Sequence, residues 1–212
     1  MSIFNQNSSF IKFVMRILDV LTVNILWLLC SLPIITIGAS TCAAFYVTQK
    51  MVDDEEGYVS RQFFKGFKDN LKQGTIMWLF TAPSIYVCYL IWQLISKSDD
   101  ISFIIILGAI LYTAIIAFVN IYSYAQIARY KNGLKMIIRN SVAITSIYFP
   151  RTILMILIVA LEVAIIFWNH YTLAVGAFIG PEIIIYTIAG MTKKIFLQIE
   201  RHENENSGTI NQ

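Results

Sequence analysis

"LLCSLPIITIGASTC", residues 28–42, lies in one of the most apolar parts of the chain, yet it contains a proline, a glycine and several hydroxyl residues. Pro33 removes a backbone donor and disfavours a helical conformation at the preceding residue, so a helix tends to end there. The hydroxyl residues that follow suit the N-cap of a returning helix, and Gly38 permits an unusual turn. The stretch therefore predicts a helical hairpin that turns at Pro33–Ser40.

A single proline-kinked crossing by residues 17–39 is the alternative, because membrane helices tolerate proline. The single crossing gives five membrane helices in all, and the hairpin gives six. Lys and Arg concentrate on the cytoplasmic side of membrane proteins. The hairpin places every Lys and Arg of the chain except Lys97 on one side, whereas the single crossing also moves Lys12 and Arg16 to the opposite side. We therefore favour six helices with both termini cytoplasmic.

The composition of the whole chain is that of a membrane protein. Hydrophobic residues make up 57% of the sequence and charged residues 14%, and the mean hydropathy is +0.66, whereas a soluble domain is about one quarter charged. Four further apolar stretches are each near or above the roughly 20 residues that cross a bilayer; they lie at about 74–96, 101–128, 148–168 and 171–192. The sequence predicts an all-α, polytopic membrane domain over residues 1–195, followed by a disordered, polar cytoplasmic tail over 196–212.

Two basic segments, about 58–73 and 129–141, are predicted to lie at the membrane interface. In the first, aromatic residues recur at near-helical spacing beside a second stripe of cations, which is typical of a helix lying flat on the membrane. Such segments either anchor the topology only or also dock a cytoplasmic partner. The candidate contacts to lipid headgroups or to a partner are Arg61, Lys65, Lys68, Lys72, Lys135 and Arg139. The acidic run at 52–58 is predicted to be a solvated loop.

Ionisable residues inside the predicted membrane helices are candidate functional residues, because a charge in the bilayer is costly. Glu162 and Glu182 lie on consecutive helices joined by a tight turn, so they could face each other, with His170 at the outer mouth. The Gly-Pro pair before Glu182 could break the last helix and free backbone carbonyls. The two carboxyl groups would then bind a proton or a cation, or would be protonated and hydrogen-bonded to neighbouring helices. Asp19 is predicted to pair with Arg16 one turn away.

No motif of a hydrolase, a nucleotide-binding protein or a metalloenzyme occurs in the sequence. The two histidines fall on opposite sides of the membrane in either topology, and the three cysteines lack metal-ligand spacing. We therefore predict no enzyme, no metal, no cofactor and no nucleic-acid partner.

The stretch "RILDVLTVNILWLLCSLPIITIGASTCAAFYV" (16–47) resembles the YesL-like family of bacterial integral membrane proteins, whose molecular function is unassigned. The resemblance continues through residues 61–79, where an aromatic and basic pattern matches, and it weakens after about residue 80. The residues that carry it are Asp19, Asn24, Trp27, Leu28, Pro33, Thr36, Gly38, Ala39, Ala44 and Tyr46, followed by Phe63, Phe64, Phe67, Lys68 and Asn70.

The resemblance implies a role in carbohydrate uptake, because genes of this family tend to lie beside importers of oligosaccharides driven by ATP (ABC importers). It implies an accessory protein of the bacterial cytoplasmic membrane, with lipids and the membrane subunits of a sugar importer as partners. The chain lacks the coupling-loop pattern of importer permeases, which argues against its being the permease. The alternative is a small secondary transporter or channel, alone or as a homo-oligomer, that uses the intramembrane carboxylates. The resemblance transfers no catalytic or ligand residues.

Overall fold

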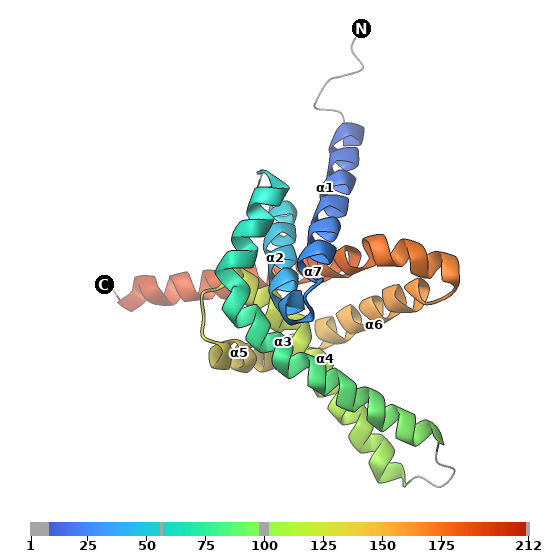
Figure 1. Ribbon diagram of the computed structural model, residues 1–212. Coiled ribbons are helices and arrows are strands. Elements are labelled where there is room, and N and C mark those ends of the chain that lie inside the picture. The colour runs from blue at the N-terminus through green and yellow to red at the C-terminus, as the bar shows by residue number, and fades with distance from the viewer. Residues whose placement is uncertain (1–8, 56, 98–101, 211–212) are drawn as a thin grey trace.

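The computed structural model describes residues 9–55, 57–97 and 102–210, with side chains from residue 11 to residue 201. The described residues form seven α-helices and one short 3-10 helix (Figure 1). The prediction of an all-α fold is confirmed. The elements are α1 (Ser9–Cys30), η1 (Ile34–Thr36), α2 (Ile37–Val52), α3 (Val59–Lys97), α4 (Phe103–Arg129), α5 (Leu134–Ile147), α6 (Phe149–Ile166) and α7 (His170–Ile210).

Five of these helices, α1, α3, α4, α6 and α7, are long and apolar enough to cross a membrane. The chain is therefore a polytopic helical membrane protein. The remaining candidate, α2, has 16 residues. At 1.5 Å per residue it is about 24 Å long, which is less than the roughly 30 Å of the hydrocarbon core. The difference between the predicted five and six crossings thus depends on this one short helix.

The predicted hairpin between α1 and α2 is present. Near the turn, Trp27 Nε1 on α1 donates to Thr41 Oγ1 on α2 at 3.1 Å. At the other end of the pair, Arg16 binds the carboxylate of Asp54 at 2.9 Å. Contacts at both ends show that the two helices run antiparallel along each other.

The turn itself lies earlier in the chain than predicted. It occupies residues 31–36, and Ser40 is already inside α2. Thr36 stands at the N-cap position of α2 but does not cap it. Its hydroxyl instead contacts the carbonyl oxygens of Cys30, at 2.6 Å, and Pro33, at 2.7 Å. Thr36 thereby ties the start of α2 back to the end of α1.

Gly38 does not form a turn, contrary to the prediction. It lies inside α2, and no described glycine has a positive φ. The missing side chain instead lets α3 approach. A Cβ built on Gly38 would lie 2.1 Å from the carbonyl oxygen of Gly74, and one built on Gly74 would lie 2.8 Å from the Cα of Ala39. Small residues at a helix crossing of this kind are characteristic of membrane proteins.

The basic segments belong to helices that pack on the rest of the domain. Residues 59–73 are the first part of α3 and pack along α2, where Phe63 is fully buried and Gly66 faces the ring of Tyr46. The second segment ends α4 and begins α5. Gln126 on α4 donates to Ser141 on α5 at 2.8 Å, so this segment also packs against the rest of the domain.

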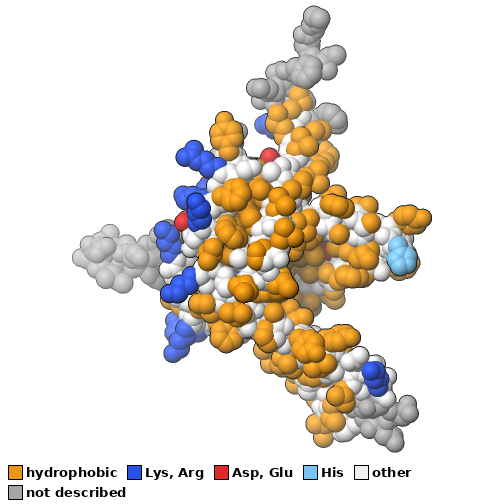
Figure 2. Space-filling model, in the orientation of Figure 1, with side chains coloured by type: hydrophobic (Ala, Val, Ile, Leu, Met, Phe, Trp, Pro, Cys, Tyr) orange, Lys and Arg blue, Asp and Glu red, His pale blue; other side chains and the backbone are white. Residues whose placement is uncertain are grey.

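The helix α2 lies at the centre of the molecule, and eleven of its 16 residues are buried. From this centre α1, the α3–α4 pair and the α6–α7 pair extend in different directions (Figure 1). Hydrophobic side chains cover the outer surfaces of these arms (Figure 2). Surfaces of this kind suit contact with lipid chains or with other membrane helices.

The stretch predicted to be a disordered tail is helical up to Ile210. Its first residues belong to the packed domain, because Phe196 is fully buried and Glu200 binds Arg129. Residues 211 and 212 lie outside the described residues.

Candidate functional site

Glu182 on α7 is the centre of a buried polar cluster that joins three helices. Its side chain is fully buried, as are those of Asn24 on α1 and Thr48 on α2. The Thr48 hydroxyl lies 2.5 Å from Glu182 Oε1. The backbone N–H of Glu182 donates to Asn24 Oδ1 at 3.3 Å. A carboxyl, an amide and a hydroxyl therefore meet where α7 packs on the α1–α2 hairpin.

Asn24 bridges two backbone groups of α7. Its Nδ2 donates to the carbonyl of Phe178, while its Oδ1 accepts from the N–H of Glu182. The Phe178 carbonyl and the Glu182 N–H are four residues apart, and a regular α-helix joins two such groups directly by a hydrogen bond. Pro181 lies between them and has no N–H to donate. The helix that the Gly-Pro pair could have broken is continuous, and Asn24 binds it on either side of the proline.

The predicted pairing of Glu162 with Glu182 is not found among the described residues. Glu162 on α6 accepts a hydrogen bond from Thr187 on α7 at 2.6 Å. Positions 182 and 187 lie about 140° apart around the helix axis, so α7 presents them on different sides. His170 is exposed at the start of α7, about 18 Å along the axis from Glu182. The three predicted residues therefore do not form one site.

The six predicted docking cations are all exposed, four on α3 and two on α5. Within the described residues, none of the six makes an ion pair. Lys and Arg side chains gather along one side of the molecule, the left side in Figure 2, while Lys97 ends α3 far from them. We refer to Arg61, Lys65, Lys68, Lys72, Lys135 and Arg139 as the cationic face.

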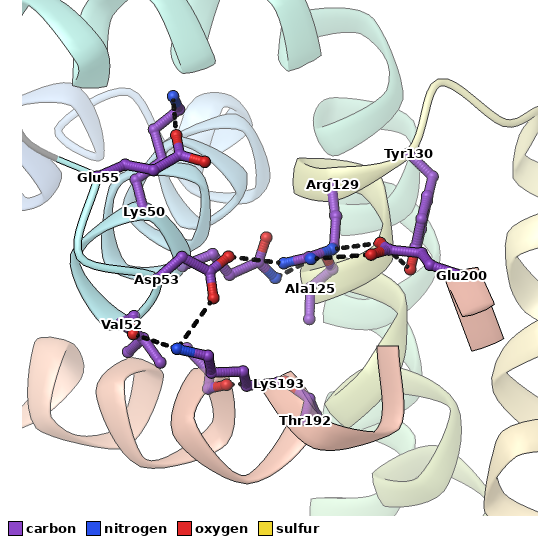
Figure 3. Close-up of polar contacts among 12 residues, drawn as sticks. Lys50, Val52, Asp53, Glu55, Ala125, Arg129, Tyr130, Thr192, Lys193 and Glu200 are labelled. Carbon is purple, nitrogen blue, oxygen red and sulfur yellow. Dashed lines mark hydrogen bonds and ion pairs between the residues drawn. The ribbon is translucent and has the colours of Figure 1, made fainter. Parts of the chain in front are cut away.

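Most of the acidic run at 52–58 is an exposed loop, as predicted, with side-chain exposures of 83% for Asp54 and 58% for Glu55, but Asp53 is mostly buried. Asp53 bridges two cations from different helices, with Arg129 on α4 at 3.1 Å and Lys193 on α7 at 3.3 Å (Figure 3). Lys193 also donates to the carbonyl of Val52 at 2.6 Å. Glu55 pairs with Lys50 at 2.7 Å. Glu56 lies outside the described residues.

Arg129 completes this ion cluster on its other side. Its Nε donates to Glu200 at 2.8 Å, and its guanidinium lies 5.8 Å from the centre of the Phe196 ring. The hydroxyl of Tyr130 donates to the same carboxylate at 2.9 Å. Burial raises the pKa of the Tyr130 phenol, so the group stays a donor at neutral pH. Two cations and two carboxylates balance, which indicates a structural cluster joining α2, α4 and α7.

Arg16 also has a different partner from the one predicted. Its guanidinium binds Asp54 and the carbonyl of Met51, both at the end of α2, rather than Asp19 on its own helix. The contact closes the open end of the hairpin. A cleft of about 790 Å³ lies beside it, between the start of α1, the acidic run and the start of α3.

Sequence reasoning did not select Asn24 or Thr48 as site residues. The available signal was a strongly polar side chain, Asn24, in the middle of an apolar helix, because such a group requires a partner inside the membrane. Among the described side chains, no group of three or more His, Cys, Asp or Glu residues is placed to hold a metal ion.

Comparison with known proteins gives one match. A family model described as "Protein of unknown function, DUF624" matches residues 20–92. The matched segment runs from α1 to α3 and contains Asn24 and Thr48 but not Glu182. No curated protein and no solved structure matches the chain. Over most of the α1–α2 hairpin and most of α3, the chain is thus similar to a family whose function is unknown.

Proposed function

We propose that the protein is a non-enzymatic accessory subunit of a carbohydrate ABC importer in the bacterial cytoplasmic membrane. The observation that carries the proposal is the cationic face, in which α3 and α5 contribute exposed cations that have no acidic partner among the described residues. Cations that stabilise the fold, such as Arg129 and Lys193, are paired. The unpaired ones are available to another molecule.

The proposed orientation places the cationic face in the cytoplasm. With six crossings and both termini inside, Lys97 is the only Lys or Arg on the outer side, as the positive-inside rule requires. The pairing of Arg16 with Asp54 supports this arrangement, because it puts the starts of α1 and α3 at the same end of the hairpin. Anionic lipid headgroups would meet the same cations at the membrane surface.

The sugar importer is the partner implied by the resemblance to the YesL-like family. The apolar arms offer surface to the membrane subunits of such an importer, and the cationic face offers a polar contact on the cytoplasmic side. Exposed charges contribute to such contacts mainly through orientation and association rate, and salt weakens them.

The proposal is tested by purifying the tagged protein from native membranes and identifying the enriched proteins by mass spectrometry. We expect membrane subunits of a carbohydrate ABC importer to be enriched over control membranes. Reversing the charge of Lys65, Lys68, Lys135 and Arg139 should weaken their recovery, and more salt should weaken it in the wild type. Reversal of Lys97 alone is the matched control. A stable lone homo-oligomer without importer subunits would refute the proposal.

A small secondary transporter or channel is the second candidate. It is favoured by a single observation, namely that Glu182 is fully buried and one oxygen of its carboxyl has no partner among the described residues. The site would comprise Glu182, Asn24 and Thr48, since Glu162 lies on another side of α7. Under this function, Glu182→Gln should abolish sugar-dependent growth while the protein remains inserted, and Glu162→Gln should not. Normal growth of the Glu182→Gln strain would exclude this role.

A further inference from the structure

Three oxygen atoms lie in a chain of contacts between α2 and α7. Thr48 Oγ1 is 2.8 Å from the carbonyl oxygen of Ala44 and 2.5 Å from Glu182 Oε1. A carbonyl can only accept a hydrogen bond, and a hydroxyl has one proton to donate. If Glu182 were ionised, both neighbours of the hydroxyl would be acceptors, and the two contacts would share a single proton.

We propose that Glu182 is a proton-binding site, which holds a proton at neutral pH and donates it to Thr48 Oγ1. The Thr48 hydroxyl is then free to donate to Ala44, and each of the two contacts contains one proton. The proton is the ligand of this site, and it joins α7 to the α1–α2 hairpin. The inference is independent of the importer proposal.

The surroundings of the carboxyl support a neutral acid. The second oxygen, Oε2, is buried and accepts no hydrogen bond from a described group. A buried carboxylate with one donor and no counter-ion would be strongly disfavoured relative to the acid.

No described cation forms an ion pair with Glu182. Four helices pack against α7, namely α1, α2, α4 and α6. Their charged side chains are Lys12, Arg16, Asp19, Lys50, Arg129, Arg151 and Glu162. Three of these cations are held by carboxylates at 53–55 and 200, away from the site: Arg16, Lys50 and Arg129.

Glu162 provides a matched control within the same protein. It also contacts a threonine hydroxyl, that of Thr187, at 2.6 Å. The Thr187 hydroxyl has no second acceptor among the described groups, so its single proton can be donated to Glu162 Oε1. Glu162 Oε2, like Glu182 Oε2, is buried without a hydrogen-bond partner among the described groups, but the Glu162 residue is partly exposed, whereas Glu182 is fully buried. The number of acceptors around the threonine hydroxyl therefore distinguishes the two glutamates.

The direct test is infrared spectroscopy of the full-length protein in lipid nanodiscs at neutral pH. A protonated carboxylic acid has a C=O stretching band distinct from that of a carboxylate. We expect this band in the wild type and in Glu162→Gln, and its loss in Glu182→Gln. The amide of Gln can still donate to Thr48, so this variant should fold. If Glu182→Gln does not insert into the membrane, the Glu162→Gln variant is labelled with carbon-13 at its glutamate carboxyl carbons. The C=O band of the protonated acid should then shift.

A second measurement uses the pH dependence of thermal unfolding. Because the native contact contains the proton and an unfolded glutamate loses its proton above about pH 4.3, raising the pH from there to neutral and just beyond should lower the melting temperature of the wild type more than that of Glu182→Gln. Thr48→Ser should behave like the wild type, and Thr48→Val should lose stability at neutral pH. Absence of the acid band from the wild type, its persistence in Glu182→Gln, or identical pH profiles for these two proteins would overturn the proposal.

Discussion

Gly38 on α2 and Gly74 on α3 meet backbone to backbone, with no side chain between the two helices. A Cβ on Gly38 would overlap the Gly74 carbonyl oxygen, at 2.1 Å. This crossing sets the distance between the central helix and the long helix that carries part of the cationic face. The position of that face therefore depends on two residues that have no side chains.

Gly38→Ala should separate α2 from α3 and destabilise the protein. The added methyl group meets backbone, which cannot move aside, so we expect a loss of about 1–3 kcal/mol, as for overpacked cores. Thermal unfolding in detergent measures the effect. Gly108→Ala is the matched control, because a Cβ there meets nothing within 4 Å. Equal stability of the two variants would contradict the close crossing.

Asn24→Val should weaken the attachment of α7 to the hairpin. The substitution leaves the Phe178 carbonyl and the Glu182 N–H without their side-chain partner, at an expected cost of about 1–3 kcal/mol. Hydrogen exchange at the Glu182 amide should become faster than in the wild type. Asn70→Ala, which removes only a local contact to the carbonyl of Gly66, should leave exchange at this amide unchanged. Unaltered exchange in Asn24→Val would show that Asn24 does not support the helix.

The topology can be tested by cysteine labelling after the three native cysteines are replaced. With six crossings, Ile34→Cys at the hairpin turn should react with an impermeant reagent added outside. Lys12→Cys should react only after permeabilisation. Both positions are exposed, so protection from the reagent reports the side of the membrane. Labelling of Lys12→Cys from outside would restore five crossings.

Asp53→Asn should loosen the ends of α2, α4 and α7 together. Arg129 and Lys193 would lose their shared carboxylate while remaining partly buried, with side-chain exposures of 18% and 33%. We expect destabilisation of about 1–3 kcal/mol, measured by thermal unfolding. Asp69→Asn removes an exposed carboxylate of α3 that makes no ion pair with the described residues. A comparable loss in that control would indicate a general charge effect.

The parts of the fold that the sequence predicts are those with local causes. Long apolar stretches predict helices long enough to cross a membrane, and Pro33 predicts the end of α1 because proline acts on its immediate neighbours. The role of Gly38 was not predictable, since the same residue permits a turn or a close helix crossing. The choice depends on Gly74, which lies on another helix.

The polar contacts were missed because their partners are far apart in the sequence. Asp53 binds residues 76 and 140 positions away, so the acidic run has the composition of a solvated loop. The residues of the predicted tail likewise include Glu200, which reaches Arg129. Glu182 is buried, but its partners, Asn24 and Thr48, belong to the other end of the chain. Only packing brings them together.

The bond from Asn24 to Glu182 also has a consequence for biogenesis, because it joins the first helix to the last across 158 residues. At about 5–20 residues per second, the ribosome needs about 8 to 30 seconds to make that interval. During this time Asn24 and Thr48 are in an apolar helical hairpin without the helix that satisfies them. Insertion of α7 then completes the hydrogen bonding of helices that entered the membrane first. A nascent chain interrupted before Pro181 would retain unpaired polar groups, and membrane quality control could recognise it by that property.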